Sequence, residues 1–126
     1  MMKSLSAVVS RSSMIVLLAC APAHGFEDVD GTFRRLSEKQ QTGVRELLDL
    51  ILADGPASRV KAVRSIAGER ICGLIDAKNG NDQYLGFRPF VVDLAQQTLH
   101  IEGEGQSERY RRNQARMNRD CGKRRL

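Results

Sequence analysis

The chain has 126 residues, of which 41% are hydrophobic and 28% charged, and a formal net charge of +5. Its length is that of one domain with a modest core. The positive charge belongs to the C-terminus, because residues 26–106 contain 10 basic and 13 acidic residues, whereas residues 107–126 contain 8 basic and 2 acidic ones.

Residues 1–25 have the order of a secretory signal peptide. A positively charged start is followed by a short apolar run, residues 14–21, and then by small residues. The run is too short for a permanent membrane span, so we expect an exported protein that is periplasmic or secreted. The alternative is an outer-membrane lipoprotein, since the Leu-Leu-Ala-Cys sequence ending at Cys20 resembles a bacterial lipobox that would lipidate this cysteine.

Residues 26–126 are predicted to form a single small α+β domain. An acidic lead-in, residues 26–33, is expected to be loose. Ser37 and Gln40 then have the spacing of a helix capping box, and apolar side chains follow at helical spacing. The pattern predicts an amphipathic helix over residues 38–53, with its apolar stripe at Val44, Leu47, Leu48 and Ile51.

Four strands in an antiparallel meander are predicted after this helix. Apolar and polar side chains alternate in these segments, as in half-buried strands. Asn79-Gly80 is expected to supply a tight hairpin turn between the second and third strands. The predicted strands lie within residues 58–68, 69–78, 83–94 and 97–103.

Three residues of these strands carry further expectations. Pro89 favours an edge strand or a bulge. Gly86 indicates a place where another group, most simply an internal aromatic ring, packs against the backbone. His100 is expected to be an exposed strand histidine and not a catalytic base, because its side chain faces away from Leu99 and Ile101.

Residues 107–126 form a basic segment that is predicted to be helical up to residue 120. One face carries a thin packing stripe of Tyr110, Gln114, Met117 and Cys121. Another face carries a row of positive charges, which attract polyanions in a salt-dependent way. We call this row the basic stripe and regard it as a candidate anion-binding surface: Arg109, Arg112, Arg116, Arg119 and Lys123. The alternative is a solvated tail that keeps the protein soluble.

Removal or lipidation of Cys20 leaves Cys72 and Cys121 in the mature domain. An even pair in an exported chain is most simply a disulfide. The bond would tether the C-terminal helix and, in the loop-entropy model, contribute roughly 4 kcal/mol across its 49-residue loop. Two free thiols for redox chemistry are the alternative, but the Cys-x-x-Cys spacing of such sites is missing.

The sequence has no recognised catalytic constellation and no residue spacing typical of a zinc or calcium site. Asp76, Asn79, Asn81 and Asp82 are therefore interpreted as turn residues. We expect no cofactor, no metal and no enzymatic activity. A small hydrolase, the less favoured alternative, would place His100 or the pair of Asp76 and Asp82 in a concave pocket.

One segment also carries a family-like pattern, strongest at residues 72–90. It consists of Cys72-Gly73, Lys78-Asn79, Tyr84-x-Gly86-Phe87 and the aromatic Phe90, together with Cys121 near the C-terminus. This pattern resembles one found in small exported bacterial proteins without an established activity, some of them lipoproteins. The resemblance implies export, a disulfide and a small α+β domain. The chain departs from the pattern at Leu74 and Asp76, where an acidic residue and Asn are common.

Together these features predict a non-enzymatic binding or structural module of the bacterial envelope. Its basic stripe would contact anionic lipid, an anionic envelope polymer or an exported protein, since genomic DNA is not expected in that compartment. The second hypothesis is an inhibitor of an exported enzyme, with a protruding hairpin at residues 79–82.

Overall fold

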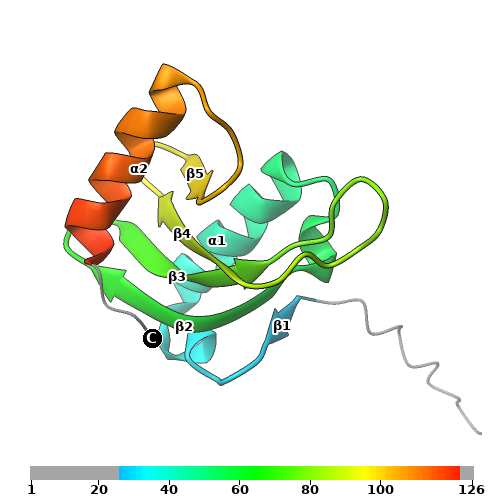
Figure 1. Ribbon diagram of the computed structural model, residues 1–126. Helices are drawn as coiled ribbons and strands as arrows, with labels where there is room; N and C mark the ends of the chain where they lie inside the picture. The colour runs from blue at the N-terminus through cyan, green and yellow to red at the C-terminus, as the bar shows by residue number, and fades with distance from the viewer. Residues whose placement is uncertain (1–25, 123–126) are drawn as a thin grey trace, which may run out of the picture.

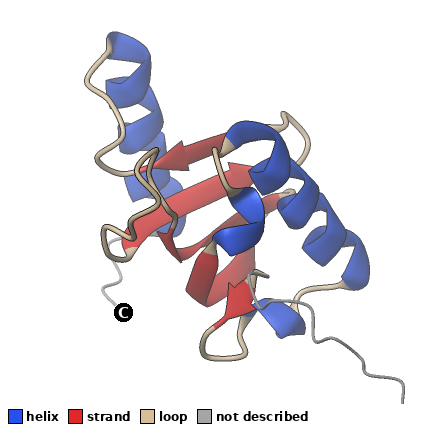
Figure 2. Ribbon diagram, turned by 90° about the vertical axis from the view of Figure 1, so that its right-hand side faces the viewer, coloured by secondary structure: helices blue, strands red, loops and turns tan. Residues whose placement is uncertain are grey.

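The computed structural model describes residues 26–122, which form a five-stranded sheet with one α-helix on each face (Figures 1 and 2). The predictions for the signal peptide, Cys20 and Lys123 concern residues outside this range. No helix within residues 26–122 is long and apolar enough to cross a membrane. In chain order the elements are β1 (Glu27–Asp28), η1 (Phe33–Arg35), α1 (Glu38–Ile51), η2 (Gly55–Ala57), β2 (Arg59–Ile66), β3 (Arg70–Asp76), β4 (Arg88–Asp93), β5 (Thr98–Ile101) and α2 (Glu108–Cys121).

The sheet has the strand order β1-β2-β3-β4-β5, with a parallel pair between β1 and β2 and antiparallel pairs elsewhere. The α+β class and the meander of β2 to β5 are confirmed. The prediction of a four-stranded, purely antiparallel sheet was wrong, because the acidic lead-in contributes β1. The backbone N–H groups of Glu27 and Val29 donate to the carbonyls of Ser58 and Val60, both at 2.9 Å.

Helix α1 begins at the predicted capping box. The Ser37 Oγ accepts from the Gln40 N–H at 3.1 Å, and the Gln40 Oε1 accepts from the Ser37 N–H at 3.1 Å. The helix ends at Ile51, two residues before the predicted end. The chain then folds back closely, since a Cβ at Gly55 would lie 2.5 Å from the Leu48 carbonyl oxygen. Glycine is therefore required at this position for space.

The core lies between α1 and the face of the sheet that carries Ile71 and Ile75. Burial of each large apolar side chain contributes about 1.5–3 kcal/mol, so this layer holds α1 in place. A Cβ at Gly73 would lie 2.9 Å from the Phe90 ring, so glycine lets that ring pack flat on β3. The fully buried large side chains are Phe33, Val44, Leu47, Leu48, Val60, Ile71, Ile75, Phe90 and Val92.

Strand β2 departs from the regular alternation that the sequence suggested. Its register against β3 shifts between Lys61 and Arg64, and Ala62 has a φ of +52°. The N–H of Ala62 donates to the Asp30 carboxylate at 2.8 Å. Burial opposes ionisation of Asp30, but hydrogen bonds from the Thr32 side chain and from backbone N–H groups outweigh it and lower the pKa of this carboxyl. The carboxylate of Asp30, in the acidic lead-in, thus stabilises a bulge in β2.

The connection between β3 and β4 turns at the predicted residues, 79–82, but it is a longer loop than the predicted tight hairpin. Strand β4 starts at Arg88 instead of residue 83, and only Lys78 and Tyr84 form an isolated bridge before it. The Asp82 N–H donates to the Asn79 carbonyl at 3.0 Å, and the Asn79 side-chain oxygen also accepts from the N–H groups of Asn81 and Gln83. The positive φ angles of the loop fall at Asp82 and Gly86.

The surroundings of Gly86 and the strand position of Pro89 also differ from the predictions. No atom lies within 4 Å of a Cβ placed on Gly86, so the predicted close neighbour is absent and its φ of +107° explains the glycine. Pro89 lies in β4, which pairs with β3 and β5 and is not an edge strand. Its carbonyl accepts from the Glu102 N–H, so its nitrogen faces β5 beyond the end of that strand at Ile101. The absent N–H is thereby tolerated.

Candidate anion-binding surface

Helix α2 extends over Glu108–Cys121, within one residue of the predicted bounds. The Ser107 Oγ caps it by accepting from the Tyr110 N–H at 3.0 Å. Gly122 ends it with a φ of 76°, a value in the left-handed region that suits glycine. The ends of the helix are therefore encoded locally.

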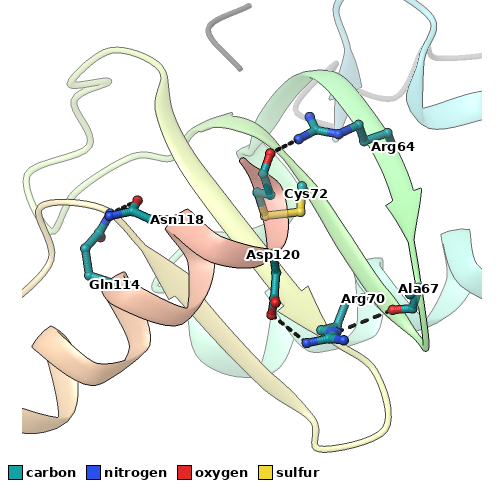
Figure 3. The surroundings of a disulfide bond; sticks show 8 residues. Arg64, Ala67, Arg70, Cys72, Gln114, Asn118 and Asp120 are labelled. Carbon is teal, nitrogen blue, oxygen red and sulfur yellow. Dashed lines mark hydrogen bonds and ion pairs between the residues drawn. A yellow bond between two sulfur atoms is a disulfide. The ribbon is translucent and has the colours of Figure 1, made fainter. Parts of the chain in front are cut away.

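The predicted disulfide between Cys72 and Cys121 is present (Figure 3). It joins the last residue of α2 to the middle of β3, with 5.8 Å between the two Cα atoms. Because Cys72 faces away from Ile71 and Ile75, the bond holds α2 on the sheet face opposite α1. The disulfide is compatible with an exported protein.

Two arginines from the sheet strengthen the same junction. The Arg70 Nη1 lies 2.5 Å from the Asp120 Oδ2, and the Arg64 guanidinium donates to the Cys121 carbonyl (Figure 3). A cation on the last carbonyls of a helix also interacts favourably with the helix dipole. The C-terminal end of α2 is thus held by one covalent bond and two charged contacts.

His100 contributes to this junction and is not exposed, so that prediction was wrong. Its side chain is buried under α2, with the Nε2 2.8 Å from the Gln114 Oε1 and the ring 4.9 Å from that of Tyr110. Gln114 donates its own amide to Glu102 and Asn118, so its oxygen is free to accept from His100. The imidazole serves as a packing and hydrogen-bonding residue.

The apolar contribution to the α2 junction is small. Met117 is the only buried hydrophobic side chain of this helix. The Tyr110 hydroxyl accepts from the Gly103 N–H at 2.7 Å, so this ring lies over the β5–α2 connection. The predicted packing stripe of Tyr110, Gln114, Met117 and Cys121 does face the sheet, but mostly through polar contacts.

The basic stripe lies on the solvent-exposed side of α2, with Arg116 at the edge of the stripe that borders the sheet. The side chains of Arg109, Arg112, Arg116 and Arg119 are all exposed. Within residues 26–122, none of the four forms an ion pair. Asp120, the acidic residue closest in sequence to the end of the stripe, is already paired with Arg70. The four guanidinium groups therefore present uncompensated positive charge to solvent.

Two depressions lie near the helices. A cavity of about 40 Å³ between α2 and the sheet is lined by Arg70, His100, Arg116 and Asp120, among others. This volume holds about one water molecule and no larger ligand. An open groove of about 500 Å³ runs beside α1, where Glu38, Glu46 and Glu69 line it together with Leu94.

The carboxylates that a hydrolase would use, those of Asp76 and Asp82, lie outside these two depressions. Asp76 is buried and pairs with Arg59 at 2.7 Å, and the hydrogen bond that Arg59 donates to this carboxylate raises the pKa of Arg59. Asp82 is exposed and pairs with Lys78 at 3.1 Å, which raises the pKa of this lysine. Neither carboxylate lines the two depressions. Within residues 26–122, no three metal-ligating side chains are grouped closely enough to hold a metal ion.

The sequence predicted the residues of the stripe, but the contacts of Arg64 and Arg70 with α2 were missed. Their positions in β2 and β3 give no signal of a partner that lies 50 or more residues later in the chain. Comparisons with family models, with curated proteins and with solved structures gave no match.

Proposed function

We propose that the protein is a non-enzymatic binding module of the bacterial envelope that contacts anionic envelope components through the basic stripe. The observation that carries this proposal is the row of four exposed arginines without acidic partners on a helix that a disulfide fixes to the sheet. A fixed helix keeps the guanidinium groups on one side of the domain, so they attract a polyanion together.

The chemistry of arginine defines the class of ligand. A guanidinium group donates two parallel hydrogen bonds to phosphate or carboxylate oxygens, which adds to the Coulomb attraction. Four such groups along three turns suit a ligand with repeated negative charges. Phospholipid headgroups, phosphorylated envelope polysaccharide and acidic surfaces of exported proteins all have this property.

The test is retention of the exported protein on anionic lipid or envelope material at low salt. We expect Arg112→Glu with Arg116→Glu to abolish retention, because the pair changes the stripe by four charge units. Arg35→Glu with Lys39→Glu is the matched control, since both side chains are exposed and lie at the other helix. Retention of the stripe variant at the level of the unsubstituted chain would contradict the proposal.

A second candidate is an inhibitor of an exported enzyme. It is favoured by the loop between β3 and β4, in which residues 80–86 are all exposed. An inhibitory loop inserts into the active site of its target, so a pull-down from a periplasmic extract should recover an enzyme. Replacement of residues 80–86 by a glycine-serine segment should abolish this recovery, and an unchanged yield would exclude the loop as the contact.

A further inference from the structure

The open groove beside α1 has an excess of negative charge. Its lining comes from α1 and from the β2–β3 and β4–β5 turns, and it includes the carboxylates of Glu38, Glu46 and Glu69. All three side chains are exposed, and within residues 26–122 none of them forms an ion pair. Among the described residues of the lining, Lys39 is the only cation. We call this depression the acidic groove.

The acidic groove also contains apolar surface. A Cβ placed on Gly43 would lie 3.0 Å from the Leu94 Cδ2, so glycine lets this leucine pack closely against α1. Leu94 is half-buried against the core, and its remaining surface lines the groove. An arginine side chain suits such a place, because its aliphatic stem covers apolar surface while its guanidinium group binds a carboxylate.

The basic stripe matches the acidic groove in charge and in length. Residues 26–106 have an excess of three acidic side chains, and residues 107–126 have an excess of six basic ones. At a rise of 1.5 Å per residue, Glu38 and Glu46 are about 12 Å apart along α1, and Arg112 and Arg119 are about 11 Å apart along α2. Two arginines of one helix therefore have the spacing of two glutamates of the other.

A chain does not fill its own groove with its own stripe. Within residues 26–122, no arginine of the stripe lines the groove, and the sheet lies between α1 and α2 (Figure 2). We infer that the acidic groove binds the basic stripe of a second copy of this chain. That copy is an exported protein with an acidic surface, so the inference rests on the proposed function and names one partner for the stripe.

The groove and the stripe are different surfaces, so the contact between two copies is heterologous. One such contact leaves a free groove on one copy and a free stripe on the other, to which further copies add. The assembly therefore grows with protein concentration. Because opposite charges hold it together, salt dissociates it.

Sedimentation equilibrium of the exported protein, without lipid, tests the inference. At 0.01 M salt and about 1 mM protein, a concentration that populates even a weak contact, we expect an average mass at least about twice that of one chain. At about 1 M salt, where charges are screened within about 3 Å, the mass should fall to that of one chain. The mass of one chain at low salt would overturn the inference.

Charge reversal in the groove should prevent the association. Glu46→Lys with Glu69→Lys brings like charges together, so this groove variant should have the mass of one chain at low salt. Glu27→Lys with Asp49→Lys is the matched control, because both side chains are exposed, lie outside the groove and give the same change of charge. The control should still associate. Equal masses of the groove variant and the control would overturn the inference.

A mixture of two variants tests the pairing of the surfaces. The stripe variant, Arg112→Glu with Arg116→Glu, should have the mass of one chain by itself. In an equimolar mixture with the groove variant, opposite charges face each other again, so the average mass should return to at least about twice that of one chain. A mixture with the mass of one chain would overturn the inference.

The proposed function and this inference fail in different ways. Masses measured without lipid do not change if the stripe fails to bind anionic vesicles. A chain that binds anionic vesicles but keeps the mass of one chain at low salt would refute the inference alone.

Discussion

The two helices are attached to the two faces of one sheet by different physical means. Helix α1 buries Val44, Leu47 and Leu48 in the core, whereas α2 buries Met117 alone. The disulfide, one ion pair and several hydrogen bonds replace the missing apolar area on the α2 side. Burial thus forms the domain, and covalent and polar contacts add a charged helix to it. A helix attached in this way can expose most of its surface for binding.

The largest expected effect follows from removal of the disulfide. Cys72→Ala with Cys121→Ala should detach α2 and lower the free energy of unfolding by up to roughly 4 kcal/mol, as the loop-entropy model gives. Hydrogen exchange should then show unprotected amides in α2 and protected amides in β3 and α1. Protection of α2 equal to that of the oxidised chain would mean that its noncovalent contacts suffice.

A cavity on the α1 side should change hydrogen exchange in both α1 and the sheet, whereas loss of the disulfide should change it in α2. Leu48 is completely buried, so Leu48→Ala should lower the free energy of unfolding by about 2–5 kcal/mol, as measured by denaturant titration. Exchange should accelerate in α1 and in the sheet together, because both share this core. Leu50→Ala, at an exposed position of the same helix, is the control and should leave the stability nearly unchanged. Faster exchange confined to α1 would contradict a shared core.

The smallest effect concerns the bulge that Asp30 stabilises. Its folded-state pKa is lowered, so its contribution to stability is present above the unfolded-state pKa and disappears as the pH falls through the folded-state pKa. Asp30→Asn should therefore be less stable than the unsubstituted chain at neutral pH, with the difference closing below about pH 4. Thermal unfolding across this pH range measures it, and a difference independent of pH would exclude the carboxylate charge as its cause.

Local signals accounted for most of the elements. The capping box at Ser37 fixed the start of α1, and Ser107 and Gly122 encode the ends of α2 within one residue. The pair of Cys72 and Cys121 was predictable because an exported chain with two cysteines has a single intramolecular pairing. The apolar alternation located β2 to β5, but it gave no indication of the bulge at Ala62, where the backbone N–H donates to the Asp30 carboxylate.

The features that the sequence did not predict all depend on residues far away in the chain. β1 has two residues, too few for a periodic pattern, and forms only because β2 presents an unpaired edge. His100 is buried because the disulfide places α2 over β5, which its strand position alone could not reveal. The residues of the basic stripe were predictable from helical spacing, but the pairing of the nearby Asp120 with Arg70 was not.

The most direct test of the stripe is the salt dependence of binding to anionic vesicles, measured for the unsubstituted chain and for the Arg112→Glu, Arg116→Glu variant. Screening shortens the range of charge interactions from about 30 Å at 0.01 M salt to about 3 Å at 1 M. Binding of the unsubstituted chain should fall steeply over this range, whereas the variant should bind weakly at every salt concentration. Equal binding by the two chains at low salt would contradict the account.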